Sequence, residues 1–548
     1  MASPLGPGHP MDSAMIYKTA GVVLYLGVLL VIGVVASRRM KDMRDYYAGG
    51  KQLGFWAAAF SARATGESAW LLLGLTGMGA LVGFKGLWVV LGEVVGVGLA
   101  WMLMCGRFKL LTDRYDAITI PDYLEGRFRD TRQRLRRVSA LALVIFVTIY
   151  VSAQIDATGT AFESFLGIDY FIGSLIGFAV VLVYIVSGGF VAVVWSDVFQ
   201  GTLMLVGLVA LPILGLVYAG GVEPVAESLR ALDPSLLTLS GAGGWSLATV
   251  LQVVGLVVIG VGFLGSPQIF VRFLALKDTR EVRPGAILAV CWTILGDTGA
   301  VLTGMVGRAL LTETGGPSAE AVLGTGAQDV LPMLAEHILP AALVGLVIAI
   351  VLSAIMSTID SLLVLASSAA VRDWYQQVRH PTLPDASLMT ISRVVTVGLA
   401  VVALALSMTV AVLSPTRTVF WFVVFGWSGI AATFCPTMIL SLFWSRMTTK
   451  GAMASMVTGF LCVPVFKFLV PEIPVIGATV AELSELPPSF ALALLAAVVV
   501  SRMDKAGQGE LEGVAEDLQW AARSMKEQAR DGDFEPAPAI ASSSPPEA

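Results

Sequence analysis

The chain has 548 residues, of which 56% are hydrophobic and 14% charged, and its mean hydropathy is +0.80. A soluble protein of this length would divide into domains with polar surfaces, and the long apolar runs exclude that arrangement. The net charge is −5, and we expect no nucleic-acid partner.

Thirteen apolar runs predict an all-α integral membrane protein with about 13 transmembrane helices, because about 20 apolar residues cross the hydrocarbon core. The runs lie at residues 14–37, 53–80, 84–106, 137–162, 167–187, 190–219, 247–273, 285–311, 337–371, 390–412, 418–444, 452–470 and 486–502. We therefore expect an external segment at 1–13, a transmembrane domain at 14–502 and a tail at 503–548.

The distribution of lysine and arginine predicts the orientation in the membrane. Most of the 35 basic residues fall in alternate loops, above all in 38–52 and 107–137. This bias places those loops and the C-terminus in the cytoplasm, and the N-terminus outside. In the tail, the sequence predicts a charged amphipathic helix at 510–530 and a disordered end at 533–548.

Two apolar runs are interrupted by residues that suit a helix poorly. The interruptions are SARATGESAW at 61–70 and GVGFLGSPQIF at 260–270. Backbone polar groups cannot stay unpaired against lipid, so a broken helix at membrane depth lines a cavity inside the protein. Two breaks at corresponding positions predict a secondary transporter with a binding site near the midplane. The halves, about 53–219 and 247–444, have five spans each and would form an inverted repeat.

The first break offers oxygen atoms and charges. Thr65, Gly66 and Glu67 lie where the helix should open, and freed carbonyls suit a small cation. Gly66 could instead serve close helix packing. Arg63 and Glu67 are four residues apart, so on an intact helix they could form an ion pair.

The ninth run carries LSAIMSTIDSLLVLASS, which is rich in side-chain oxygen. Ser353, Ser357, Asp360 and Ser361 share one helical face, and Thr358 lies beside them. Hard cations prefer hydroxyl, carbonyl and carboxylate oxygens, so this run predicts an ion site. The alternative is that the hydroxyls bond to their own helix backbone.

Four further acids fall inside apolar runs, where a charge is costly and marks a functional candidate. They are Glu93, Asp156, Asp197 and Asp297. Asp197, near the start of the sixth run, is part of an ion exit path or a helix-end residue. The other three are functional groups or buried partners of an arginine such as Arg63, and the sequence leaves the pairing open.

The second break exposes backbone donors and acceptors to a polar solute at Gly260, Gly262, Gly265, Ser266 and Pro267. Phe263 would supply an apolar wall, and Trp70 and Tyr150 could add aromatic surface with a polar atom. Ordinary helix packing is the alternative for each aromatic side chain.

Motifs for other activities are absent from the sequence. It contains no G-x-x-x-x-G-K-[ST], no H-E-x-x-H and no G-x-S-x-G. We therefore expect neither an ATP-driven pump nor an enzyme.

Seven segments resemble the sodium:solute symporter family, most closely its bacterial sodium/proline symporters. They are DYYAGGKQLGFW (45–56), AITIPDYLEGRF (117–128), FVTIY (146–150), GGFVAVVWSDVFQG (188–201), GSPQIFVRFLA (265–275), MSTIDSLL (356–363) and FWSRMTTKGAMASM (443–456). The resemblance implies a leucine-transporter-type 5+5 inverted repeat in a bacterial inner membrane. It also implies sodium-coupled uptake of a small solute, with proline first among the candidates.

The resemblance also implies the residues of the site. Sodium would bind to the carbonyls of Ala64, Glu67 and Ala354 and to the hydroxyls of Ser357 and Thr358. Asp197 matches an acidic residue on the sodium path. Solute is expected near Thr65 at the break and near four positions that match the pocket lining, which are Trp70, Tyr150, Phe263 and Pro267.

This chain departs from the proline transporters at both breaks. They carry aspartate and methionine where this chain has Gly66 and Glu67, so the Glu67 side chain could itself contribute to the ion site. Ile259 and Phe263 replace a tryptophan and a tyrosine, so a sodium symporter for another small solute is an alternative. A membrane sensor that binds solute without moving it is a second alternative, and an intramembrane enzyme is a third. The expected partners are sodium, solute and the lipid bilayer, and the sequence leaves the oligomeric state open.

Overall fold

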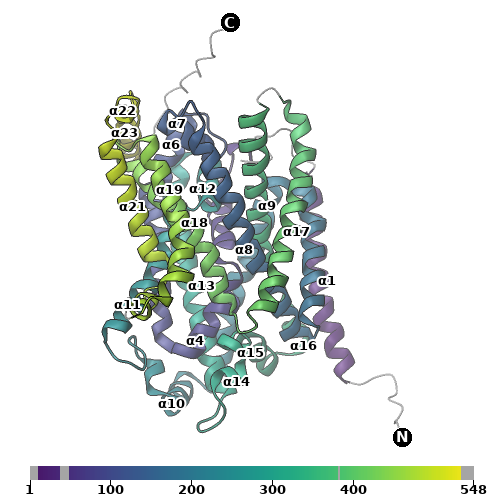
Figure 1. Cartoon of the computed structure of the whole chain (residues 1–548). Helices are drawn as coiled ribbons and strands as arrows, with labels where there is room; N and C mark the ends of the chain where they lie inside the picture. The colour runs from purple at the N-terminus through teal and green to yellow at the C-terminus, as the bar shows by residue number, and fades with distance from the viewer. Residues whose placement is uncertain (1–9, 38–48, 381–382, 475, 532–548) are drawn as a thin grey trace.

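The structure is a computed structural model that describes residues 10–37, 49–380, 383–474 and 476–531. Within these ranges it is a bundle of α-helices without β-strands, as predicted (Figure 1). The helices that build the body of the bundle are α1 (Pro10–Ser37), α3 (Phe55–Ala69), α4 (Thr76–Val82), α5 (Leu87–Leu99), α6 (Gly106–Arg114), α7 (Ile120–Phe128), α8 (Arg134–Leu166), α9 (Tyr170–Tyr218), α11 (Leu247–Val258), α12 (Pro267–Ala275), α13 (Val282–Leu311), α16 (Ala341–Ser368), α17 (Asp385–Leu413), α18 (Val419–Phe443), α19 (Thr449–Pro464) and α21 (Leu486–Met503).

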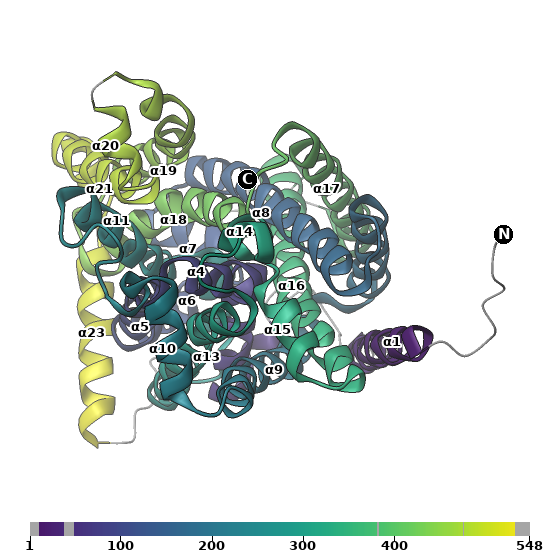
Figure 2. The same ribbon diagram turned by 90° about the horizontal axis from the view of Figure 1, so that it is seen from below.

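Short helices cover the two ends of the bundle (Figure 1). The lower end carries α10 (Val222–Leu232), α14 (Ala319–Leu323) and α15 (Val330–Ile338). The upper end carries α22 (Lys505–Gly509) and α23 (Val514–Asp531). A further short helix, α20 (Gly477–Ala481), precedes α21. Seen from below, α1 lies at the periphery of the bundle, apart from the central helices (Figure 2).

In the described residues, 11 helical stretches are long and apolar enough to cross a membrane. One of them covers 60 residues from Phe55 to Arg114, and a shorter apolar helix lies at Tyr170–Leu182. The predicted runs 53–80 and 84–106 both fall in the 60-residue stretch, and the run 167–187 contains the shorter helix. The expected total of about 13 spans stays a prediction.

The structure contains both predicted breaks. The first was expected at Thr65–Glu67, but the backbone is helical there and leaves the helix at Ser68, with φ 42° and ψ −168°. A π-helical turn follows at Trp70–Leu75. At the second break, a 3-10 turn at Ile259–Leu264 ends before Gly265, and α12 begins at Pro267, whose missing N–H suits the first turn of a helix.

Glycines hold the second break close to α5. A Cβ atom on Gly260 would lie 1.9 Å from the carbonyl oxygen of Gly92, and one on Gly96 would lie 1.9 Å from the carbonyl oxygen of Gly260. No side chain fits at these positions without a backbone shift. The close approach fixes the unwound segment at the centre of the bundle, as small residues do at membrane helix interfaces.

The helix predicted at 510–530 corresponds to α23, and it packs on the upper end of the bundle. Val514, Leu518 and Ala521 are buried. The Asp517 carboxylate accepts hydrogen bonds from Arg114, Tyr115 and Arg129 at 2.7–2.9 Å. The predicted disordered end at 533–548 and residues 1–9 of the predicted external segment lie outside the described residues.

Candidate functional site

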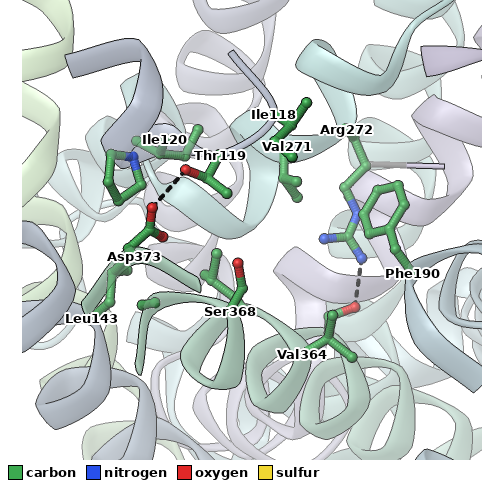
Figure 3. Close-up of a pocket in the computed structure, with 14 residues that line it drawn as sticks. Ile118, Thr119, Ile120, Leu143, Phe190, Val271, Arg272, Val364, Ser368 and Asp373 are labelled. Carbon is green, nitrogen blue, oxygen red and sulfur yellow. Dashed lines mark hydrogen bonds between the residues drawn. The ribbon is translucent and has the colours of Figure 1, made fainter. Parts of the chain in front are cut away.

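Two cavities of very different size approach the centre from opposite ends. A cavity of about 1030 Å³ lies between the ends of α4, α11, α17 and α18, and its lining includes Ile149, Ile259 and Trp421. On the other side, α7, α9, α12 and α16 enclose a narrow cavity of about 20 Å³ that reaches from Arg272 to Asp373 (Figure 3). The structure is therefore accessible from the end that carries α10 and α14.

α16 places two hydroxyl groups against the carbonyls of α3, just before its break. Ser357 Oγ donates to the Ala64 oxygen at 2.9 Å and to the Ala354 oxygen at 3.2 Å. Thr358 Oγ1 donates to the Thr65 oxygen at 3.2 Å and to the Ala354 oxygen at 3.1 Å. The structure thus brings together four of the five residues expected to bind sodium. The hydroxyls contact carbonyls of both α3 and their own helix, and the ion site expected in this run stays a prediction.

Glu67, the fifth expected sodium ligand, has other partners. Its carbonyl oxygen accepts a hydrogen bond from the backbone N–H of Trp70. Its side chain forms an ion pair with Arg63 and lies near Glu93 and Asp297. The expected i,i+4 ion pair is therefore present, because α3 remains helical through Glu67.

Asp197 sits in a buried polar group that adjoins the hydroxyl groups of α16. Its Oδ2 atom lies 3.0 Å from Arg272 Nη2 and accepts a hydrogen bond of 2.6 Å from Ser61 Oγ. Arg272 Nη2 also donates to Thr65 Oγ1 at 2.8 Å and to Ser361 Oγ at 2.5 Å. Arg272 therefore joins α12 to α3, α9 and α16 at the inner end of the narrow cavity (Figure 3).

The other polar side chains of α16 have separate partners. Ser353 Oγ donates to the Ala349 oxygen of its own helix at 2.7 Å. Asp360 accepts a hydrogen bond from Ser196 of α9 at 3.4 Å. These two hydrogen bonds stabilise α16 and its contact with α9.

Aromatic side chains gather beside both breaks. Trp427 of α18 lies with its ring centroid 5.0 Å from Phe263 and 6.5 Å from Tyr150, and its Nε1 atom donates to the Ile259 oxygen. Tyr150 donates to Ser68 Oγ at 3.4 Å. Ile149 and Ile259, which line the large cavity, are chain neighbours or hydrogen-bond partners of this group, so the group adjoins that cavity.

The remaining residues expected at the solute pocket are Trp70, Pro267 and Thr65, and the structure gives each a different position. Trp70 Nε1 donates to the Gly66 oxygen at 3.3 Å, and its ring packs against Phe420. Pro267 begins α12. The Thr65 hydroxyl turns away, toward Arg272 and Ser361.

The structure resolves the pairing that the sequence left open. Arg63 contacts Glu67, Glu93 and Asp297. Asp156 of α8 pairs with Arg417, which lies in the segment between α17 and α18. Asp156 also accepts a hydrogen bond of 2.5 Å from Tyr170.

Sequence reasoning missed three buried residues of the site, which are Arg272, Gln154 and Trp427. Arg272 lies at the end of the predicted run 247–273 and was assigned no role, but it is 1% exposed and lies within α12. The apolar run continues on both sides of it, and that continuity was the available signal of a buried charge. Gln154 accepts from the backbone N–H of Ala69 at 3.0 Å and donates to Ser68 Oγ at 3.3 Å, so it satisfies the broken backbone.

A bundle of apolar helices, with two central breaks and buried polar groups between them, defines a membrane transporter with discontinuous helices. Residues 46–459 match the sequence model of the sodium:solute symporter family. The chain belongs to this family, and it is a sodium-coupled transporter rather than an enzyme.

Relatives and solved structures agree with this assignment. The chain is 33% identical over 483 residues to the osmoregulated proline transporter OpuE of Bacillus subtilis, covering 88% of this chain and 94% of the relative. It is 31% identical over 490 residues to the sodium/proline symporter of Escherichia coli, covering 89% and 93%. A solved Na+-coupled sialic acid symporter, in a substrate-bound outward-open state, has a TM-score of 0.71 at 17% identity, covering 89% of this chain and 98% of that one. This likeness establishes the leucine-transporter-type fold.

Proposed function

We propose that this protein imports proline, or a small solute of similar chemistry, together with sodium across a bacterial inner membrane. The observation that carries the proposal is the contact of the Ser357 and Thr358 hydroxyls with carbonyls of α3 beside its break. The names of the relatives, a proline transporter and a sodium/proline symporter, support proline as the first candidate.

Sodium would bind among the carbonyls of Ala64, Glu67 and Ala354 and the hydroxyls of Ser357 and Thr358. These oxygen atoms are the hard ligands that a small cation prefers. Because they belong to α3 and α16, an ion among them would link the two helices and order the backbone at Ser68. Sodium and solute would then favour each other's binding by the same factor.

Solute would bind next to the break, between Ser68 and the aromatic group of Tyr150, Phe263 and Trp427. The rings offer apolar surface of the kind that a pyrrolidine ring requires, and the unwound backbone offers polar atoms. Ile259 and Phe263 replace a tryptophan and a tyrosine of the proline transporters. This changed wall favours a second candidate, a sodium symporter for another small solute.

The proposed halves, residues 53–219 and 247–444, would rock about the central site and expose it to each side in turn. With the N-terminus outside and the tail in the cytoplasm, the large cavity faces outward. Arg272 lines the narrow cavity and pairs with Asp197, so Asp197 would lie on the inward path of the ion.

Uptake into proteoliposomes tests this proposal. Purified protein is reconstituted, and uptake of a radiolabelled amino-acid panel is measured with an inward sodium gradient and with potassium in its place. We expect sodium-dependent accumulation of proline. Sodium-dependent accumulation of another panel member instead would favour the second candidate, and binding of a solute without accumulation would contradict both.

A further inference from the structure

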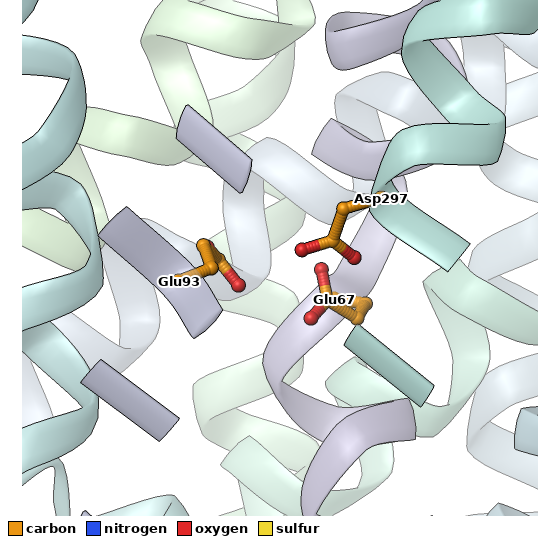
Figure 4. Close-up of side chains that lie close together, drawn as sticks. All are labelled: Glu67, Glu93 and Asp297. Carbon is orange, nitrogen blue, oxygen red and sulfur yellow. The ribbon is translucent and has the colours of Figure 1, made fainter. Parts of the chain in front are cut away.

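A second charged group lies beside the first break, and a sodium ion held by backbone carbonyls and the hydroxyls of α16 does not account for its carboxylates. Glu67 of α3, Glu93 of α5 and Asp297 of α13, which we name the acid cluster, are 0–1% exposed. One carboxylate oxygen from each lies within 4.8 Å of the other two. Figure 4 shows the three carboxylates turned toward one another.

Arg63 supplies one positive charge to these three carboxylates. Its Nη2 atom lies 3.3 Å from Glu93 Oε2 and 3.8 Å from Asp297 Oδ1, and it contacts Glu67 directly. Among the described residues, no other lysine, arginine or histidine lies within 4.0 Å of them. With all groups ionised, two negative charges remain uncompensated at membrane depth, where each charge costs about 2.5–3.5 kcal/mol on insertion scales.

Hydrogen bonds do not compensate for the missing positive charge. Both carboxylate oxygens of Asp297 are buried and accept no hydrogen bond in the part of the chain that the structure describes, and the Arg63 guanidinium lies 3.8 Å from Oδ1. The Arg63 guanidinium is held in place by the rings of Phe263 and Trp292, at 4.9 Å and 5.3 Å. A buried carboxylate without a hydrogen-bond donor is stable only when a cation or a proton reaches it.

We infer that the acid cluster is a second cation site, which takes one monovalent cation in addition to the sodium ion proposed at α16. Three carboxylate oxygens at this spacing suit a sodium ion, and a proton would supply the same charge. Glu67 directly precedes Ser68, so a cation here would act on the same break that the first ion orders. The inference rests on the proposed function, because it adds a second coupling ion to that transport cycle.

The number of cations moved per solute tests the inference. In proteoliposomes, a fixed solute gradient is opposed by a series of ion gradients. The ion gradient at which net solute flux is zero gives the number of cations moved per solute. We expect Asp297→Asn and Glu93→Gln to move one cation fewer per solute than the wild type. Asp156→Asn is the matched control, because Asp156 is a buried membrane acid that pairs with Arg417 away from the cluster, and we expect it to keep the wild-type number.

Two versions of this measurement distinguish sodium from a proton as the cation at the acid cluster. If the loss appears when the sodium gradient is varied at constant pH, the cluster binds sodium. If it appears when the pH gradient is varied at constant sodium, the cluster binds a proton. Unchanged coupling to both ions in Asp297→Asn and Glu93→Gln would overturn the inference.

Direct binding separates this inference from the proposed function. Should the wild type move no proline with sodium, radioactive sodium binding and proton release are measured on the purified full-length protein. Thr358→Ala is expected to weaken cation binding at the first site and to leave the cation at the acid cluster in place. This measurement tests the second site even if neither acid variant can be purified. A Thr358→Ala protein that retains no bound sodium and exchanges no proton would overturn the second site.

Discussion

Arg272 is the residue on which the buried polar contacts of the site converge. Its guanidinium reaches Asp197, Thr65, Ser61 and Ser361, which belong to three different helices. Removal of one partner from a buried ion pair leaves the other charge uncompensated. Arg272 therefore contributes more to the local structure than an exposed arginine would.

We predict that Arg272→Gln lowers the free energy of unfolding by about 3–5 kcal/mol, the usual cost of breaking a buried pair. The double variant Arg272→Gln with Asp197→Asn should recover part of this loss, because it removes the stranded carboxylate. Thermal unfolding of the purified proteins measures both. Arg280→Gln is the control, because the Arg280 side chain is 63% exposed. If the double variant loses as much free energy of unfolding as Arg272→Gln and Asp197→Asn lose together as single variants, the pairing of Arg272 with Asp197 is contradicted.

At the scale of elements, α23 ties the tail to the ends of the transmembrane helices. Asp517 is bound by Arg114, Tyr115 and Arg129, and the Arg114 guanidinium stacks on Trp520 at 4.9 Å. Burial raises the pKa of Tyr115 and the Asp517 carboxylate raises it further, so the Tyr115 hydroxyl stays protonated and donates. The tail is therefore a docked element of the fold over the described part of its length.

We predict that Asp517→Asn weakens this docking, because the two arginines lose their anion at a buried position. A loss of about 1–3 kcal/mol corresponds to local opening that is roughly 5- to 150-fold more frequent. Limited proteolysis between α21 and α23 measures it, since cleavage requires the open form. Glu516→Gln changes an exposed acid on the same helix and should cleave like the wild type. Equal rates for the two variants would show that Asp517 does not hold the helix.

At the scale of the whole molecule, access to the centre is asymmetric. The large cavity ends beside the aromatic group, while Arg272, Asp373 and the helices around them close the other side (Figure 3). The breaks at Ser68 and Gly265 lie between these two regions. A structure that is open to one side and closed to the other, around discontinuous helices, is one state of an alternating-access cycle.

Much of this fold was predictable because its signals are local. Long apolar runs and helix-breaking residues mark the spans and both breaks, and the dense hydroxyls of Ser357 and Thr358 point to the proposed ion site. The contacts of Arg272 and the acid cluster were not predictable, because they join helices that are 30 to more than 200 residues apart in the sequence. The first break lies at Ser68, after the predicted Thr65–Glu67, because the ion pair of Arg63 and Glu67 stabilises the preceding helical turn.

The sodium dependence of uptake by Thr358→Ala tests the central claim most directly. Loss of one hydroxyl ligand should raise the sodium concentration for half-maximal uptake by about tenfold to a hundredfold, since a hydrogen bond or ligand contact to a charge is worth about 1.5–3 kcal/mol. Ser353→Ala, which removes a hydroxyl bound to its own helix, should keep the wild-type value. Equal sodium dependence in the wild type, Thr358→Ala and Ser353→Ala would contradict a sodium site at the contact between α3 and α16.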